Sequence, residues 1–223
     1  MDKDRQIEQL LTSGLVAVIR RPPPEGVEHI AAALADGGVG ALEITADTPE
    51  VYRLIADMKA KYGDRLLVGA GTVLKLAQAE QAIAAGADFI FSPNLNEAIV
   101  ELTLQHGRIS IPGVMTPTEV VRGHEAGADL LKVFPGGSLG ASYIKELQGP
   151  LGHIRMMPTG GVTLANAGAF IAAGAVAVGL GSALVDREAV EQGDYGKITE
   201  TARRFAKEVS KARMNNTKGA KKP

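Results

Sequence analysis

Eight short apolar runs alternate with longer amphipathic stretches along this chain of 223 residues, and the alternation predicts a (β/α)8 barrel. The runs recur about every 20–25 residues, and several of the stretches between them end on glycine just before the next run. Such alternation implies parallel strands joined by right-handed crossovers. A doubly wound open sheet is the alternative. It usually has fewer strands and a glycine-rich turn after the first strand, and no such turn follows Arg20.

The predicted strands are five or six residues long and mostly aliphatic. The stretches between them have the period of amphipathic helices, and in residues 50–61 the side chains of Val51, Leu54 and Met58 share one face. Glycines such as Gly86 and Gly127 close these stretches, because glycine accepts the left-handed conformation that often ends a helix. In chain order, the predicted strands are residues 15–20, 41–45, 66–71, 89–93, 109–114, 130–135, 155–159 and 176–181.

The chain is expected to form one domain over residues 1–210, followed by a basic tail over residues 211–223. This tail holds five lysine or arginine residues, no acidic residue and few apolar ones, so it is predicted to be disordered. An arm that binds RNA or a membrane is a less favoured interpretation of the same residues.

Composition excludes several function classes. The net charge of -1 gives no global attraction to nucleic acid or to an anionic membrane. The absence of cysteine excludes disulfides, thiolate nucleophiles and cysteine metal sites. No apolar stretch reaches the roughly 18 residues of a membrane helix, and the first residues do not resemble a signal peptide. We therefore expect a soluble cytoplasmic protein.

The four histidines have no metal-ligand spacing, and no cluster of acidic residues is typical of a magnesium site. They are His29, His106, His124 and His153. The expected chemistry is therefore metal-free.

Lys132 lies inside an apolar run that is short enough to be one buried strand. Burying an ammonium group is costly, and burial lowers the pKa of a lysine below its reference value of about 10.4. A lysine that is neutral near pH 7 is a nucleophile toward carbonyl carbon. The alternative is a lysine at the end of a strand that reaches solvent.

Glu43 is the second candidate catalytic residue. Its neighbours Leu42 and Ile44 point to the opposite face of the strand, so Glu43 and Thr45 share a side. If the two apolar residues pack on the helices, Glu43 points into the barrel. There it is either a structural partner for Lys132 or a proton shuttle beside it, and we favour the shuttle.

Glycine pairs follow the last two predicted strands. Barrels often bind phosphate between the loops after strands seven and eight, where glycine lets the backbone approach an anion closely. Each pair alone is more often only a tight turn. Together, Gly160, Gly161, Gly181 and Ser182 predict a phosphate site.

Seven short motifs follow one another along the chain. They are LEIT at residues 42–45, VGAGTV at 68–73, SP at 92–93, IPG at 111–113, LKVFP at 131–135, PTGG at 158–161 and GLGS at 179–182. In this order they resemble the 2-keto-3-deoxy-6-phosphogluconate (KDPG) aldolase family, some members of which are described as 4-hydroxy-2-oxoglutarate aldolases. The resemblance runs from about Leu11 to Phe205, which is nearly the whole chain.

The resemblance implies a role for each matching residue. Lys132 matches the lysine that forms the Schiff base, and Glu43 matches the general acid/base. Thr72 and Thr159 match hydroxyls that contact substrate. The remaining substrate-binding residues that we expect at the strand ends are Arg20, Thr45, Pro93 and Phe134. The resemblance also implies a homotrimer.

Asp47 departs from the family pattern. Many members continue with EVTLRT, where the arginine is thought to hold the pyruvyl carboxylate, whereas this chain has EITADT at residues 43–48. We therefore expect Arg20, at the end of the first strand, to supply the cation instead, because its guanidinium can bind a carboxylate through two hydrogen bonds. Asp47 is expected to face solvent or an arginine.

The expected reaction is the cleavage of a 2-keto-3-deoxy-6-phospho sugar acid to pyruvate and glyceraldehyde 3-phosphate. It needs no cofactor, because the protonated imine on Lys132 accepts the electrons. The alternatives are cleavage of 4-hydroxy-2-oxoglutarate, a sugar-phosphate isomerase or epimerase without a covalent bond, and a barrel that only binds a sugar phosphate.

Overall fold

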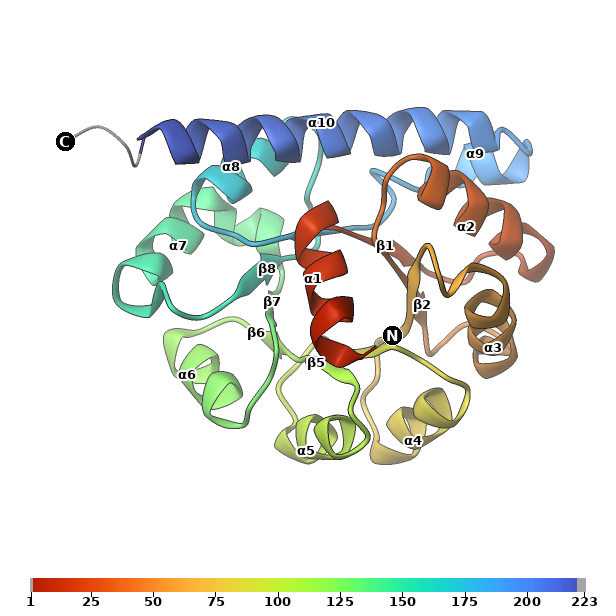
Figure 1. Ribbon diagram of the computed structural model, residues 1–223, viewed down its shortest axis with the longest axis horizontal. Helices are drawn as coiled ribbons and strands as arrows, with labels where there is room; N and C mark the ends of the chain where they lie inside the picture. The colour runs from red at the N-terminus through yellow and green to blue at the C-terminus, as the bar shows by residue number, and fades with distance from the viewer. Residues whose placement is uncertain (1, 220–223) are drawn as a thin grey trace.

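The computed structural model describes residues 2–219, and it shows a barrel of parallel strands surrounded by helices (Figure 1). The strands are β1 (Leu15–Ile19), β2 (Ala41–Thr45), β3 (Leu67–Gly71), β4 (Phe89–Phe91), β5 (Ile109–Ile111), β6 (Gly113–Val114), β7 (Leu131–Val133), β8 (Met156–Pro158) and β9 (Val178–Leu180). The helices are α1 (Lys3–Ser13), η1 (Pro24–Gly26), α2 (Val27–Asp36), α3 (Val51–Tyr62), α4 (Leu76–Ala84), α5 (Glu97–Gln105), α6 (Pro117–Glu125), α7 (Gly136–Leu151), α8 (Ala167–Ala172), α9 (Arg187–Glu191) and α10 (Tyr195–Gly219).

Two sheets with strand orders β5-β4-β3-β2-β1-β9 and β6-β7-β8 make up the barrel wall, and every pairing is parallel. A bridge between Thr159 and Gly179 joins β8 to β9. On the other side, Pro112 connects β5 directly to β6, and its carbonyl accepts a hydrogen bond from the Lys132 N–H at 2.9 Å. The predicted (β/α)8 barrel is confirmed, with residues 109–114 divided into two strands at a proline that has no N–H to donate.

The strand side chains alternate between two cores. Leu42 and Ile44 pack in the outer core, between the strands and the helices. Ala41, on the opposite face of β2, belongs to the inner core of the barrel together with Phe89 and Phe91. This alternation places Glu43 on the inner face, as the sequence predicts.

Helix α1 covers the amino-terminal end of the barrel and crosses the centre of the ring of helices in Figure 1. Its side chains Ile7 and Leu10 pack into the inner core. Gln6 Nε2 donates to Asp88 Oδ1 at 2.6 Å, and Lys59 from α3 pairs with the same carboxylate. The amino-terminal end is therefore sealed, and a ligand enters from the carboxyl ends of the strands.

Helix α10 continues through residues 211–219, so the prediction of a disordered tail is wrong for this segment. Ala212 is buried, and the Arg213 guanidinium donates to the carbonyl oxygens of Thr12, Leu11 and Val176 at 2.7–2.8 Å. These contacts hold the basic segment against the amino-terminal helix. Residues 220–223 lie outside the described residues. Within residues 2–219, no helix combines the length and hydropathy that crossing a membrane requires.

Candidate active site

Lys132 and Glu43 come from opposite parts of the barrel wall and are both buried inside it. Lys132 on β7 is 5% exposed, and Glu43 on β2 is 1% exposed. The Lys132 Nζ lies 4.1 Å from the ring centroid of Phe91 and 5.0 Å from that of Phe134. The interpretation of Lys132 as a lysine that reaches solvent is therefore wrong, because its ammonium lies over aromatic faces within the barrel.

Neither carboxylate oxygen of Glu43 has a hydrogen-bond partner among the residues that the structure describes. The side chain occupies the space above Gly71 on the neighbouring strand, where a Cβ atom would collide with Oε1. A buried carboxyl group without partners is costly as an anion. The site therefore favours a protonated Glu43, or a ligand or water that bonds to it.

Burial dominates the electrostatics of this pair. It raises the pKa of Glu43 from 4.5 to about 7, although the positive charges of Lys132 and Arg20 act in the opposite direction. Burial also lowers the pKa of Lys132 from its ordinary value, against the attraction of Glu43, and the charge of Arg20 lowers it further. The arrangement thus combines an amine shifted toward its nucleophilic form with an acid that can exchange a proton near neutral pH.

Arg20 lies at the mouth of the barrel and is held by two neighbours. Its Nη1 pairs with Asp47 Oδ2 at 3.2 Å, and its Nη2 donates to Thr72 Oγ1 at 3.1 Å. The Arg21 Nε pairs with the same Oδ2 of Asp47 at 3.0 Å. The expectation that Asp47 faces an arginine is confirmed.

The other predicted substrate-binding residues differ in their exposure and in whether their polar groups already have hydrogen-bond partners. Thr159 is buried, and its Oγ1 has no hydrogen-bond partner among the described residues. Thr45 is also buried, but its hydroxyl lies 3.3 Å from that of Thr48. Phe134 is exposed beside Lys132, whereas the Pro93 backbone packs closely on Gly113. Thr159 and Phe134 are therefore available to a ligand, while Thr45 has a local partner.

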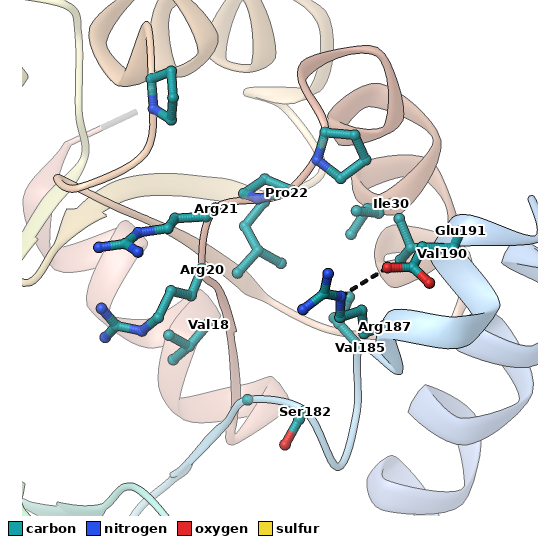
Figure 2. Close-up of a pocket in the computed structure, with 14 residues that line it drawn as sticks. Val18, Arg20, Arg21, Pro22, Ile30, Ser182, Val185, Arg187, Val190 and Glu191 are labelled. Atoms are coloured by element: carbon teal, nitrogen blue, oxygen red, sulfur yellow. Dashed lines mark hydrogen bonds and ion pairs between the residues drawn. The ribbon is translucent and has the colours of Figure 1, made fainter.

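Two of the four predicted phosphate-binding residues line a cavity of about 910 Å³ at the carboxyl end of β1 (Figure 2). These are Gly181 and Ser182, which share the cavity with Arg20 and Arg21. The lining also includes Arg187, whose Nε pairs with Glu191 at 2.7 Å. The geometry offers an anion both backbone N–H groups and guanidinium groups.

Gly160 and Gly161 do not line this cavity. They lie in the loop after β8, beside the start of α7, where the Gly160 carbonyl accepts from the Gly137 N–H at 2.7 Å and Gly161 packs on Gly137. Their φ angles of 82° and 70° require glycine, and their own N–H groups have no acceptor among the described residues. The bridge from Thr159 to Gly179 joins the strands that carry these two loops.

Comparison with known proteins identifies the chain. Residues 7–201 match the family described as "Aldolase: KDPG and KHG aldolase". The chain belongs to the KDPG and KHG aldolase family. A curated relative, the 2-dehydro-3-deoxy-phosphogluconate aldolase of Dickeya dadantii, is 38% identical over 88% of this chain and 92% of its own length. The 2-dehydro-3-deoxy-6-phosphogalactonate aldolase of Escherichia coli is 37% identical over 76% of this chain and 83% of its own length.

A solved structure of KDPG aldolase from Legionella pneumophila, with pyruvate captured at low pH as a covalent carbinolamine intermediate, has the same fold. Its TM-score to this chain is 0.82 at 28% identity, over 89% of this chain and 96% of that one. The chain is therefore a KDPG-type aldolase, an aldehyde-lyase. Among the described residues, no group of histidine and acidic side chains is arranged to hold a metal ion.

Sequence reasoning missed three features of this aldolase site. The Phe91 ring below Lys132 was expected only as part of a strand, although its position on the inner face follows from alternation along β4. Gly71 was noted only as part of the VGAGTV motif, although its missing side chain leaves the space that the Glu43 carboxyl group fills. The pairing of Arg21 with Asp47 joins residues 26 positions apart, and no local pattern indicates it.

Proposed function

We propose that this aldolase cleaves a 2-keto-3-deoxy-6-phospho sugar acid to pyruvate and glyceraldehyde 3-phosphate through an imine on Lys132. The single observation that carries the proposal is the buried Lys132 ammonium over two aromatic rings, inside a barrel that also buries a Glu43 carboxyl group with no hydrogen-bond partner in residues 2–219. Burial shifts both pKa values in the direction that imine chemistry needs.

In the first half of the reaction, neutral Lys132 attacks the C2 carbonyl of the substrate and forms a carbinolamine. Protonated Glu43 donates a proton to the departing hydroxyl, which leaves as water, and the nitrogen becomes a protonated imine. Glu43 is then a carboxylate. A pKa of about 7 suits it to both states, because a group of this kind exchanges protons readily at neutral pH.

In the second half, the Glu43 carboxylate takes the proton of the C4 hydroxyl, directly or through a water. The C3–C4 bond breaks, its electrons move to the imine, and glyceraldehyde 3-phosphate leaves. The resulting enamine is protonated at C3, and water hydrolyses the imine to release pyruvate and Lys132. Each electron pair stays on the substrate or the lysine, so the residues of the chain are sufficient for the step.

Arg20 is proposed to bind the pyruvyl carboxylate. The loops after β8 and β9 are proposed to bind the phosphate. The role of Arg20 is supported by the position of its guanidinium at the barrel mouth, where its charge acts on both Glu43 and Lys132. The glycine loops support the phosphate site through the N–H groups of Gly160 and Gly161, which have no acceptor in the part of the chain that the structure describes, and through the cavity beside Gly181. Thr72 and Thr159 are proposed to contact the substrate hydroxyls, and Pro93, Phe134 and Thr45 to shape the site.

The substrate is tested by turnover with purified compounds. The gluconate-derived and galactonate-derived phospho acids differ in configuration at C4, and this chain is similar to curated aldolases for both. The phosphate loops predict that either phosphorylated acid has a far lower KM than 4-hydroxy-2-oxoglutarate. Preferred cleavage of 4-hydroxy-2-oxoglutarate would overturn the phosphorylated assignment in favour of that second candidate.

A homotrimer is proposed as the assembly. Large apolar side chains are exposed at the carboxyl end of the barrel, including Leu74 and Met115 on loops and Leu76 at the start of α4, which are 44–50% exposed. Exposed apolar groups of this kind are typical of interaction surfaces. Light scattering coupled to size exclusion is expected to give three times the chain mass of 23.2 kDa. A monomeric mass would contradict the proposal.

A further inference from the structure

Asp47 joins two arginines at the mouth of the barrel. Its Oδ2 pairs with Arg20 Nη1 at 3.2 Å and with Arg21 Nε at 3.0 Å. Burial alone would raise the pKa of Asp47, but the Thr45 hydroxyl and the charges of the two arginines outweigh it and lower the pKa. Asp47 is therefore an anion at neutral pH, and the three groups together carry one net positive charge.

The Arg20 guanidinium is fixed at two points rather than one. While Nη1 pairs with Asp47, Nη2 donates to the Thr72 hydroxyl at 3.1 Å. Thr72 and Arg21 have φ angles of 55° and 47°, in the left-handed region that non-glycine residues rarely adopt. Two of the residues around Arg20 thus have strained backbones, a feature that is common where geometry serves function.

Arg20 needs such support, because its side chain is 55% exposed and has many rotamers. Figure 2 shows that the guanidinium groups of Arg20 and Arg21 point to the same side of the cavity, away from Arg187. Without Asp47, the Thr72 hydroxyl would be the one remaining hydrogen-bond partner of the Arg20 guanidinium among the described residues. A ligand would then have to order that side chain itself, which weakens binding.

We propose that Asp47 is a positioning residue, which holds the Arg20 guanidinium in place to receive the pyruvyl carboxylate, while Arg21 balances its negative charge. The inference rests on the proposed function, because it assumes that Arg20 binds this carboxylate. It accounts for an acid at a position where a pyruvyl-binding site would otherwise gain from a cation.

Removing Asp47 distinguishes a positioning role from a purely electrostatic role, because the two roles predict opposite changes in the affinity for pyruvate. If Asp47 acted only through its charge, Asp47→Ala would remove a repulsion and tighten the binding of pyruvate. If it positions Arg20, the same change weakens binding, although the site has become more positive. Asp47→Asn keeps one carbonyl oxygen that can accept from a guanidinium, so it is expected to restore most of the affinity.

The experiment measures the pyruvate concentration that half-saturates the borohydride-trapped adduct, together with KM and kcat for cleavage, in the full-length enzyme. Asp47→Ala is expected to raise the half-saturating concentration roughly 3- to 10-fold, the scale of ordering one long side chain. The kcat at saturating substrate is expected to change less than twofold. The matched control is Asp57→Ala, which removes an aspartate paired with Arg53 on α3, and it is expected to change neither value.

A double variant, Arg20→Ala with Asp47→Ala, is expected to bind pyruvate no more weakly than Arg20→Ala alone, because Asp47 acts only through Arg20. Unchanged or tighter binding in Asp47→Ala, with weaker binding in Arg20→Ala, would overturn the positioning role and leave the proposed function intact. If the wild-type enzyme forms no adduct with pyruvate, the proposed function fails instead.

Discussion

The substitution Glu43→Gln tests the electrostatics of the site through the stability of the fold. Gln has nearly the shape of Glu but does not ionise, so it removes the titration and keeps the packing. In the folded chain the pKa of Glu43 is raised from 4.5 to about 7, chiefly by burial. The folded state therefore holds this proton more tightly than the unfolded state does.

A raised carboxyl pKa gives stability that is fully present below the unfolded value and is lost as pH rises through the folded value. For Glu43 the window runs from pH 4.5 to about 7. At about 1.36 kcal/mol per unit, the shift corresponds to roughly 3 kcal/mol. Between these pH values, titration of Glu43 is expected to lower the free energy of unfolding of the wild-type chain by about this amount. The Glu43→Gln chain is expected to show no such loss, because Gln does not titrate.

Urea unfolding at several pH values between 4.5 and 8 measures the difference in the free energy of unfolding between the two chains, in which the contributions of titrating groups that do not interact with Glu43 cancel. The stability of Glu43→Gln relative to wild type is expected to increase by about 3 kcal/mol from pH 4.5 to pH 7. In a Lys132→Met background the increase should be larger, because the Lys132 charge lowers the pKa of Glu43. A difference that does not change with pH would refute the reasoning and indicate that Lys132 fully compensates the buried charge.

Three further substitutions test separate parts of the account. Gly71→Ala places a methyl group where Glu43 Oε1 lies, so kcat should fall by about 10²–10⁴-fold, and a normal kcat would contradict the proton-transfer role. Gly181→Ala adds a methyl group that meets no atom of residues 2–219 within 4 Å, so the free energy of unfolding should change by less than about 0.5 kcal/mol. Its KM for glyceraldehyde 3-phosphate in the condensation direction should rise far more than that for glyceraldehyde, and equal changes would count against the phosphate site. Arg213→Ala removes hydrogen bonds to three carbonyls and should lower the free energy of unfolding by about 2–3 kcal/mol in urea, whereas no change would mean that residues 211–219 are not held as described.

Strand periodicity made the barrel predictable, because eight apolar runs at a steady spacing leave few topologies to consider. The division of residues 109–114 into β5 and β6 was not anticipated, although Pro112 offered a signal, since it cannot donate to the ladder. The prediction of a disordered tail was wrong because the contacts that order residues 211–219 are distant in the sequence. The composition of the tail is that of a solvated arm, and the carbonyls that Arg213 binds come from residues 11, 12 and 176, which no local pattern connects to it.

The inward position of Glu43 was predictable from the alternation of Leu42 and Ile44, and the burial of Lys132 from its apolar run. The distance of Lys132 Nζ from Phe91 and the space above Gly71 depend on how neighbouring strands pair, which the sequence does not specify. The partition of the glycine loops, with Gly181 on the cavity and Gly161 packed on α7, likewise emerges only from tertiary structure.

The most direct test of the central claim is to treat the enzyme with pyruvate and borohydride and to locate the product by peptide mass mapping. We expect one reduced pyruvyl adduct, on the peptide that contains Lys132, and none in Lys132→Met. The exposed Lys145, on α7, is the internal control and should remain unmodified. An adduct on Lys145 or on any other lysine, or no adduct at saturating pyruvate, would contradict the account.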